Sequence, residues 1–381
     1  MTPFARSLAI CLWLALPSFA ATSAPYLVKD LPGPIDARDS LRSLWITVGN
    51  TSFFTAPTGD GLGTQVWKTD GTESGTVRIT SVVANGAVGS FIGALGNQLF
   101  YGGNDGAGDG LLVVDMNGGT PLALARGQFA ERGVLYDGAL FFVAPAREEG
   151  GTDKGVELWR TDGTLTGTTF ADLRPGSASS LASGSMIVAG DWILFAGETG
   201  AGKGIFRTDG TVAGTTMLLP LPSGLEPHEA KLTAFGDRAV FMLHSAGFNN
   251  HQLWITDGTS EAAGGTRPFV EGMSNFEPRA VLDGRLIFAM RTVGSGVKIW
   301  SSDGTFAGTL QLNDHSSSVG AVGIAGAVVG SKYFFFGIDP QTSHNALFTT
   351  GAFPGTTQKV MDLDTLRLGG TEWNGRFYFA N

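Results

Sequence analysis

Five aspartates recur at matching positions along the chain, and their carboxylates are the first candidates for chemistry. Carboxylate oxygens bind calcium and also move protons in catalysis. Each of the five is followed by Gly-Thr: Asp70, Asp162, Asp209, Asp257 and Asp303. An Asp before Gly also accepts hydrogen bonds from its own backbone two residues on. Because two further copies of the pattern lack this Asp-Gly-Thr, at Asp115 to Gly118 and at Thr350-Gly351, we predict a structural turn and no reaction centre.

A glycine-rich loop from Asn104 to Gly110 holds a second group of oxygen ligands, with carboxylates at Asp105 and Asp109. Calcium requires such ligands on a flexible loop. The Glu that would close a standard calcium loop is missing after Asp109, and a second acidic loop, Glu148 to Asp153, also lacks the full spacing. Calcium at Asp105 and Asp109 therefore stays an open alternative, and we expect no other cofactor.

Other catalytic and metal-binding patterns are missing from the sequence. There is no GxSxG, no CxxC and no phosphate-binding loop. The histidines do not show a metal-binding spacing such as HExxH: His228, His244, His251, His315 and His344. We therefore predict no catalytic residue.

The aspartates belong to a repeat that organises the whole chain. Its clearest copy is Glu157 to Thr168, Glu-Leu-Trp-Arg-Thr-Asp-Gly-Thr-Leu-Thr-Gly-Thr. Each copy has an apolar or aromatic anchor, and successive anchors lie 46 to 48 residues apart: Trp67, Val113, Trp159, Phe206, Trp254, Trp300 and Phe348. This period is typical of four-stranded propeller blades. The anchors are expected to pack between neighbouring blades, and a carbohydrate-stacking role is the weaker alternative.

Short two-residue turns mark a second repeat upstream of each anchor. Each turn precedes an aromatic or apolar strand, and the pattern predicts eight hairpins. The turns are Gly49-Asn50, Gly96-Asn97, Asp137-Gly138, Gly190-Asp191, Gly236-Asp237, Asp283-Gly284, Gly330-Ser331 and Asn374-Gly375. No helical period separates them, so we predict an all-β fold built as a β-propeller.

The segment Glu157 to Thr168, with Ala171 to Gly176 after it, resembles the ELWxxDGT repeat of bacterial secreted and envelope proteins. The resemblance covers nearly all of the chain after residue 25. It implies a propeller-like repeat domain and brings no catalytic residues with it.

The two ends of the chain complement each other. Tyr26 to Gly33 matches a blade-closing strand, and Leu368 to Asn381 provides only the first two strands of a blade. Joining them would close the ring and remove its open edges. We predict eight blades in a single domain over residues 21–381, with seven blades as the alternative if the last pair only caps the ring.

Residues 1–20 have the pattern of a secretory signal peptide. Arg6 precedes an apolar run from Ser7 to Leu16, and small residues lead to cleavage after Ala20. Cys11 only loosely fits a lipid-attachment motif. We expect an exported protein, periplasmic or extracellular, with no transmembrane segment after cleavage.

The composition and charge limit the classes of molecule that this chain is expected to bind. The formal net charge is −9, and removal of Arg6 with the signal peptide makes it −10. An acidic chain without basic clusters argues against nucleic-acid binding. With 43% hydrophobic residues and 57 glycines, the chain is expected to be globular and rich in tight turns, and we expect a monomer.

Three functions fit this pattern. The first is a binding or scaffold module for a protein or a glycan. The second is a propeller-type glycoside hydrolase or lyase with carboxylates at the central channel, and the third is a structural spacer in the envelope.

Binding would use the loops between blades, which vary while the sheets do not. The connections Leu225 to His228 and Asn275 to Pro278 look like variants of Pro175 to Ser180. The candidate rim residues are Glu226, His228, Glu277 and Arg279.

Overall fold

The computed structural model describes residues 13–15, 45–57, 63–80, 87–127, 129, 133–148, 151–221, 232–244, 251–292, 297–312, 326–339, 341–363, 370–373 and 375–379. Within these ranges the regular structure is β-strand, apart from one 3-10 turn, η2 (Glu261–Ala263). The described residues fall into two compact units. Residues 45–221 form the first, and residues 13–15 with 232–379 form the second.

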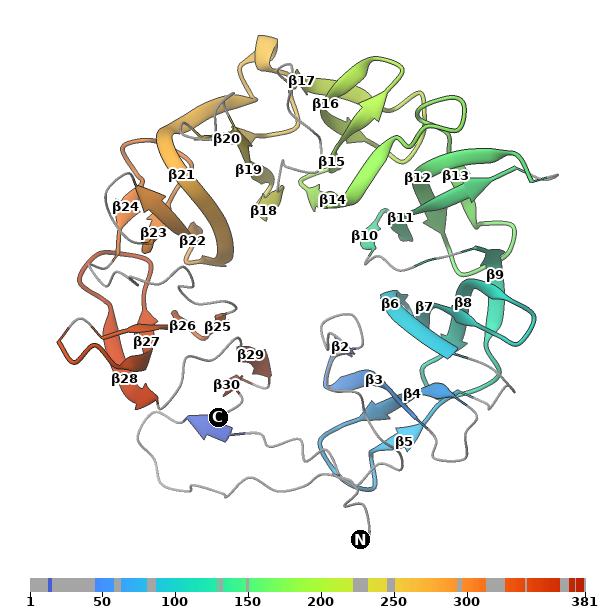
Figure 1. Ribbon diagram of the computed structural model, residues 1–381, viewed down its shortest axis with the longest axis horizontal. Helices are drawn as coiled ribbons and strands as arrows, with labels where there is room; N and C mark the ends of the chain where they lie inside the picture. The colour runs from blue at the N-terminus through green and yellow to red at the C-terminus, as the bar shows by residue number, and fades with distance from the viewer. Residues whose placement is uncertain are drawn as a thin grey trace, which may run out of the picture. The chain divides into compact units, whose positions relative to one another are not determined.

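The first unit contains four sheets, each of four antiparallel strands in chain order (Figure 1). A strand therefore pairs with its sequence neighbour throughout, as a meander. The sheets are β2 (Trp45–Val48), β3 (Thr51–Pro57), β4 (Thr64–Thr69) and β5 (Val77–Arg78); β6 (Ala87–Leu95), β7 (Gln98–Asn104), β8 (Asp109–Asp115) and β9 (Leu122–Arg126); β10 (Val134–Tyr136), β11 (Ala139–Arg147), β12 (Asp153–Thr161) and β13 (Thr169–Ala171); and β14 (Leu181–Ala189), β15 (Trp192–Thr199), β16 (Gly202–Thr208) and β17 (Thr216–Pro220).

The second unit continues the same pattern with one seven-stranded, one four-stranded and one three-stranded sheet. The first has β18 (Thr233–Phe235), β19 (Arg238–His244), β20 (His251–Thr256), β21 (Arg267–Leu282), β22 (Arg285–Thr292), β23 (Val297–Ser302) and β24 (Leu310–Gln311). The second has β25 (Ala327–Val329), β26 (Lys332–Ile338), β27 (Asn345–Thr350) and β28 (Gln358–Leu363). The third has β29 (Gly370–Trp373), β30 (Arg376–Phe379) and β1 (Trp13–Ala15).

The seven-stranded sheet consists of two repeats that share β21. Residues Arg267 to Met273 pair with β20, and Met273 to Leu282 pair with β22. The sequence predicted a connecting loop at Asn275 to Pro278, and this was wrong because the backbone stays extended and pairs with β22. Phe276 is fully buried in the cluster between these repeats, and a residue before proline, here Glu277, favours extended backbone.

The eight predicted hairpins are present in the strand pairing, from β2–β3 to β29–β30. Asp137 and Gly138 have φ of 44° and 69°, and Asp283 and Gly284 have φ of 49° and 70°. Both central residues of a type I′ turn need positive φ, which explains Asp-Gly at these places. The all-β, propeller-like repeat expected from the sequence is therefore confirmed.

The core lies between successive sheets within each unit. In the first unit, three clusters join the sheets pairwise, with Phe91 and Tyr101 in one, Phe142 in the next and Phe195 in the third. In the second unit, comparable clusters join the two repeats that share β21, then β21–β24 to β25–β28, and then β25–β28 to β30 through Phe377. Burial of large side chains between meanders is the main stabilising contact.

β30 pairs with β29 on one side and with β1 on the other. β1 falls inside the segment expected to be a signal peptide. The segment predicted to complete this sheet, Tyr26 to Gly33, lies outside the described residues.

Candidate functional site

The repeated aspartates are held in the turns that join the third and fourth strands. Oδ1 of Asp162 accepts hydrogen bonds from the backbone N–H of Thr164 at 2.9 Å and from its hydroxyl at 2.7 Å. The N–H of Gly167 donates to the hydroxyl oxygen of Thr164 at 3.0 Å. The same pair of bonds to the threonine two residues on recurs at Asp70, Asp209, Asp257 and Asp303.

These hydrogen bonds set the charge state of the five carboxyls. The threonine hydroxyl, helped by the threonine N–H, holds the pKa of each carboxyl below its ordinary value. The sequence predicted an aspartate that accepts hydrogen bonds from its own turn, and the structure has this arrangement. Oδ1 of each carboxylate is thus bound to donors of its own turn.

The anchor residues of the motif pack inside the sheets. Trp159 is 7% exposed, stacks on Phe142 with ring centroids 6.2 Å apart, and contacts Phe129 edge-on at 5.4 Å. Phe206 stacks on Phe195 at 5.1 Å, and Trp254 on Phe241 at 6.3 Å. Trp67 and Trp300 are partly buried. The rings of Trp159, Phe206 and Trp254 thus pack against other rings of their sheets.

The proposed calcium ligands lie at the loop between β7 and β8, and an arginine forms an ion pair with one of them. Nη1 and Nη2 of Arg126 donate to the two carboxylate oxygens of Asp105 at 2.8 and 2.9 Å. This fork lowers the pKa of Asp105 to about 2. Asp109 accepts a bond from Nδ2 of Asn104 at 3.0 Å. A calcium ion at Asp105 would have to displace Arg126.

Of the four predicted rim residues, Glu226 and His228 lie outside the described residues. Glu277 and Arg279 lie on β21 rather than on a loop and form an ion pair with each other. Within the described ranges, no three His, Cys, Asp or Glu side chains gather as a metal site would need.

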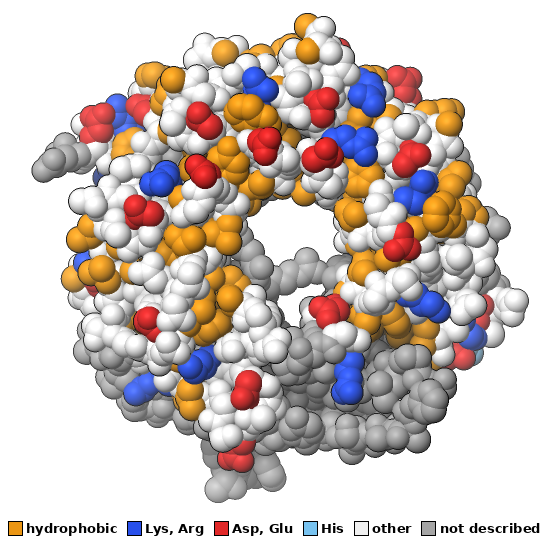
Figure 2. All heavy atoms as spheres, turned by 180° about the vertical axis from the view of Figure 1, so that it is seen from behind, with side chains coloured by type: hydrophobic (Ala, Val, Ile, Leu, Met, Phe, Trp, Pro, Cys, Tyr) orange, Lys and Arg blue, Asp and Glu red, His pale blue; other side chains and the backbone are white. Residues whose placement is uncertain are grey.

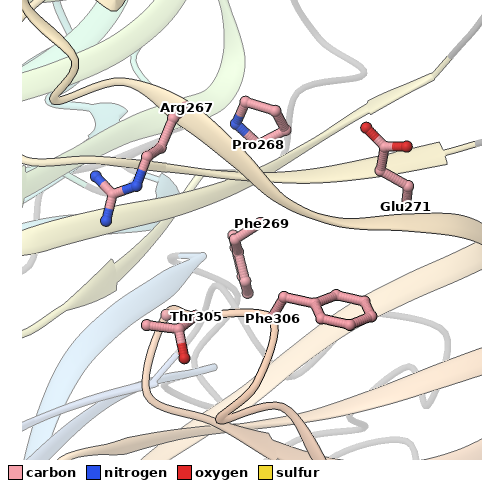
Figure 3. A pocket seen from close by; sticks show the side chains of 7 residues that line it. Arg267, Pro268, Phe269, Glu271, Thr305 and Phe306 are labelled. Carbon is pink, nitrogen blue, oxygen red and sulfur yellow. The ribbon is translucent and has the colours of Figure 1, made fainter.

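An open groove of about 450 Å³ lies in the second unit, between the start of β21 and the turn that joins β23 to β24 (Figure 3). Its lining residues are Arg267, Pro268, Phe269, Glu271, Gly304, Thr305 and Phe306. Phe306 is 76% exposed and Phe269 is buried. In Figure 3, Arg267 and Glu271 lie on opposite sides of Phe269. The groove therefore combines an exposed ring, a buried apolar floor and two charged groups.

A register shift in β21 shapes this groove. Leu253 pairs with Val270 and Trp254 with Pro268, so Phe269 is the extra residue of a β-bulge. A bulge breaks the alternation of side chains, which is why Phe269 and Val270 are consecutive and both buried. Oε1 of Glu271 accepts a hydrogen bond from Nε2 of Gln252 at 3.0 Å.

One further residue stands out for its chemistry. Glu157, the first residue of the clearest motif copy, is 0% exposed, and burial raises the pKa of its carboxyl to about 7. Such a pKa suits a general acid. A side chain without solvent access cannot meet a substrate, however, so Glu157 is not a catalytic candidate.

Sequence reasoning missed Phe306, Arg267 and Glu157. The signal for Phe306 is an aromatic residue directly after Asp-Gly-Thr, where a turn normally has a polar side chain. Glu157 could have been noticed as an ionisable residue between Val156 and Leu158 in an apolar strand. For Arg267 no signal was present, because the groove beside it is completed by Gly304, Thr305 and Phe306 of the next repeat.

The face drawn in Figure 2 mixes acidic and basic side chains with exposed apolar ones. It shows no large area of a single sign.

Comparison with known proteins gives structural likenesses only. Neither the family models nor the curated proteins that we compared match this chain. Acylaminoacyl peptidase of Pyrococcus horikoshii has a TM-score of 0.43 at 11% identity, over 88% of this chain and 48% of that chain. An oligogalacturonate lyase in complex with manganese has a TM-score of 0.42 at 18% identity, over 71% and 75%.

A puromycin-hydrolysing peptidase of Mycobacterium tuberculosis has a TM-score of 0.41 at 12% identity, over 87% of this chain and 56% of that chain. The chain thus spans about half the length of the two peptidases. We infer no activity from likenesses at this level. Separately, no helix in the described ranges is long and apolar enough to span a bilayer.

Proposed function

We propose that the chain is an exported β-propeller of the ELWxxDGT repeat type and acts as a binding module for a glycan or a protein. The observation that carries this proposal is the open groove on β21, where Phe306 is 76% exposed beside Arg267 and Glu271. A concave surface with an aromatic ring and a few fixed polar groups is the usual form of a ligand site.

The proposal includes the predicted architecture. Seven repeats of four strands and the pair β29–β30 are consistent with eight blades in one ring, and seven blades remain the alternative if the last pair caps it. The signal-peptide pattern of residues 1–20 supports export to the periplasm or beyond the cell. We propose a monomer, because the separate sheets of a closed propeller leave only short edges for self-association.

The groove favours a glycan over a peptide. A peptide that adds a strand to a sheet edge needs backbone donors along that edge, and Pro268 removes one at the middle of the groove. A sugar ring needs an apolar face to stack on and side chains that bond to its hydroxyls. Phe306 offers the first, and Arg267, Glu271 and Thr305 offer the second.

The hydrolase or lyase alternative gains no support from the described residues. Glycoside hydrolysis requires two carboxyl groups roughly 5 to 10 Å apart that both reach the substrate. The five turn aspartates are bound to their threonines, and Glu157 has no access to solvent.

The test is thermal unfolding of residues 21–381 against a panel of envelope glycans. A ligand at a hundred times its Kd stabilises the folded protein by about 2.7 kcal/mol. We expect one glycan class to raise Tm, and Phe306→Ala to abolish that shift.

Phe353→Ala is the matched control. Phe353 lies in the turn between β27 and β28 of the next repeat, is 54% exposed, and does not line the groove. A shift that survives Phe306→Ala would place the site elsewhere. No shift with any glycan would leave a protein partner, and a calcium-against-chelator arm tests Asp105 and Asp109 in the same assay.

A further inference from the structure

Glu157 ties the segment between β13 and β14 to the middle of its sheet. Its Oε2 accepts the backbone N–H of Leu173 at 2.9 Å and the hydroxyl of Ser180 at 2.5 Å. Leu173 and Ser180 lie near the two ends of residues 172–180, which join one four-stranded sheet to the next. One side chain on β12 therefore fixes both ends of this segment.

The other carboxyl oxygen of Glu157 has no such support. Oε1 is buried and has no hydrogen-bond partner among the described residues. A buried charge without full compensation is strongly unfavourable. Burial is accordingly the largest effect and raises the pKa of Glu157; the hydrogen bonds from Ser180 and Leu173 lower this pKa by less, and the negative charge of Asp172 raises it further.

The cations near this site are paired with other acids. Nζ of Lys154 lies 2.8 Å from Glu148 and 3.1 Å from Asp172. Arg174 lies 2.8 Å from Glu198 on β15. Lys154, Arg174 and their partner carboxylates thus form ion pairs that do not include Glu157.

The first repeat contains a related contact without a titratable group. Gln65 holds the motif position of Glu157, is 3% exposed, and its Oε1 accepts the hydroxyl of Thr80 at 2.8 Å. That hydroxyl oxygen accepts the N–H of Val66 at 3.0 Å. In these two copies the side chain at this position binds the segment that follows the fourth strand, and of the two only Glu157 carries a carboxyl group.

We propose that Glu157 is a proton-controlled clamp, which holds residues 172–180 against β12 when protonated and releases them when ionised. The protonated carboxyl can donate to Oγ of Ser180, because that hydroxyl has an acceptor of its own in the carbonyl of Val156 at 3.4 Å. The ionised carboxyl instead adds a buried charge beside Asp172. The loop at this end of the sheet is then closed in mildly acidic medium and opens toward neutral pH.

The direction in which the clamp responds to pH follows from the linkage between proton binding and clamp closure. The pKa of Glu157 is about 7 with the clamp closed, against 4.5 for an ordinary glutamate. The closed state therefore holds the proton more tightly, and its stability is fully present below pH 4.5 and lost as pH rises through 7. Within this window the opening constant rises about tenfold per pH unit.

Amide hydrogen exchange on the full chain tests the proposal. After correction for intrinsic exchange, the protection of Leu173 should fall at least about tenfold between pH 5 and pH 8. The N–H of Ile79, which donates to Val66 at 2.9 Å in the first repeat, is the internal control and should not change. Glu157→Gln should make the protection of Leu173 independent of pH.

Gln65→Glu provides the reciprocal variant, since it should give the N–H of Val66, which donates to the hydroxyl of Thr80, the pH dependence that Leu173 loses. It also keeps the proposal testable if Glu157→Gln fails to fold. Constant protection of Leu173 in the natural chain, or an equal fall in Glu157→Gln, would overturn the clamp. Constant protection of Val66 in Gln65→Glu would count against it as well.

Discussion

Individual anchors are stabilised by different contacts although they share one motif position. The indole N–H of Trp159 donates to the carbonyl of Ala144 at 3.1 Å, whereas that of Trp254 donates to the side chain of Gln252 at 3.2 Å. Phe206 has no polar group and relies on stacking alone. What the position requires is a large apolar side chain in the sheet, and the polar contact is fitted to each environment.

Replacement of Trp159 by alanine tests this role. Loss of a buried aromatic side chain typically costs about 3–5 kcal/mol, so the free energy of unfolding measured with urea should fall by that amount. Leu165→Ala is the control, because Leu165 is 59% exposed in the neighbouring turn and should change stability by about 0.5 kcal/mol or less. Unchanged stability in Trp159→Ala together with lost ligand binding would show that the anchors are a binding surface.

For individual residues, the sequence predicts contacts between residues that are close along the chain and misses contacts between residues that are far apart along it. Asp162 bonds to Thr164 two residues on, so its turn can be inferred from Asp-Gly-Thr alone. Arg126 reaches Asp105 across 21 residues, and Ser180 reaches Glu157 across 23. Such pairs depend on strand lengths and sheet contacts that no short pattern contains.

The turn between the third and fourth strands is the element that the motif specifies most completely. Besides the bonds of Asp162, the hydroxyl of Thr168 donates to the carbonyl of Thr164 at 2.6 Å. A Cβ added at Gly167 would lie 2.0 Å from Oδ1 of Asp162. The second glycine of the motif is therefore required for space, because the carboxylate packs directly on its backbone.

Gly167→Ala should consequently destabilise the protein by about 1–3 kcal/mol, the usual cost of overpacking. Gly200→Ala is the matched control in the same unit, since an added Cβ there meets no atom within 4 Å. Urea unfolding of both variants measures the difference. Equal stability of the two would mean that the turn rearranges at no cost, and that the motif glycine is not sterically required.

Strand positions were predicted better than strand ends. Alternating apolar residues and two-residue turns locate the hairpins, because both signals act within a few residues. The continuation of β21 through Asn275 to Pro278 was missed because these residue types are common in loops. Burial of Phe276 against a neighbouring sheet outweighs that preference.

For the whole molecule, the contacts of the last hairpin are the most informative. Phe377 on β30 is 1% exposed and lies 5.1 Å from Phe334 and 6.0 Å from Phe336, measured between ring centroids. The final two strands are thus bound to the preceding sheet. The sequence predicted this final pair of strands. It also predicted that Tyr26 to Gly33 completes their sheet, but such pairing between the two ends of the chain cannot be specified by a local sequence pattern.

If the repeats close into one ring, unfolding of residues 21–381 should be a single transition, with fluorescence and circular dichroism giving the same midpoint. Phe377→Ala should then shift this single transition to a lower midpoint, because loss of a buried aromatic side chain lowers the free energy of unfolding by about 3–5 kcal/mol. A two-step curve in which Phe377→Ala shifts only one step would instead indicate two units that unfold independently.

The shared strand β21 limits which repeats could have been gained or lost by duplication and deletion in the gene. Other neighbouring repeats are separate sheets, so a duplication or deletion between them inserts or removes one complete sheet. At β21 the sixteen residues from Arg267 to Leu282 belong to two repeats at once. A gene rearrangement with its breakpoint there would leave each product one strand short, so these two repeats should be inherited as a pair.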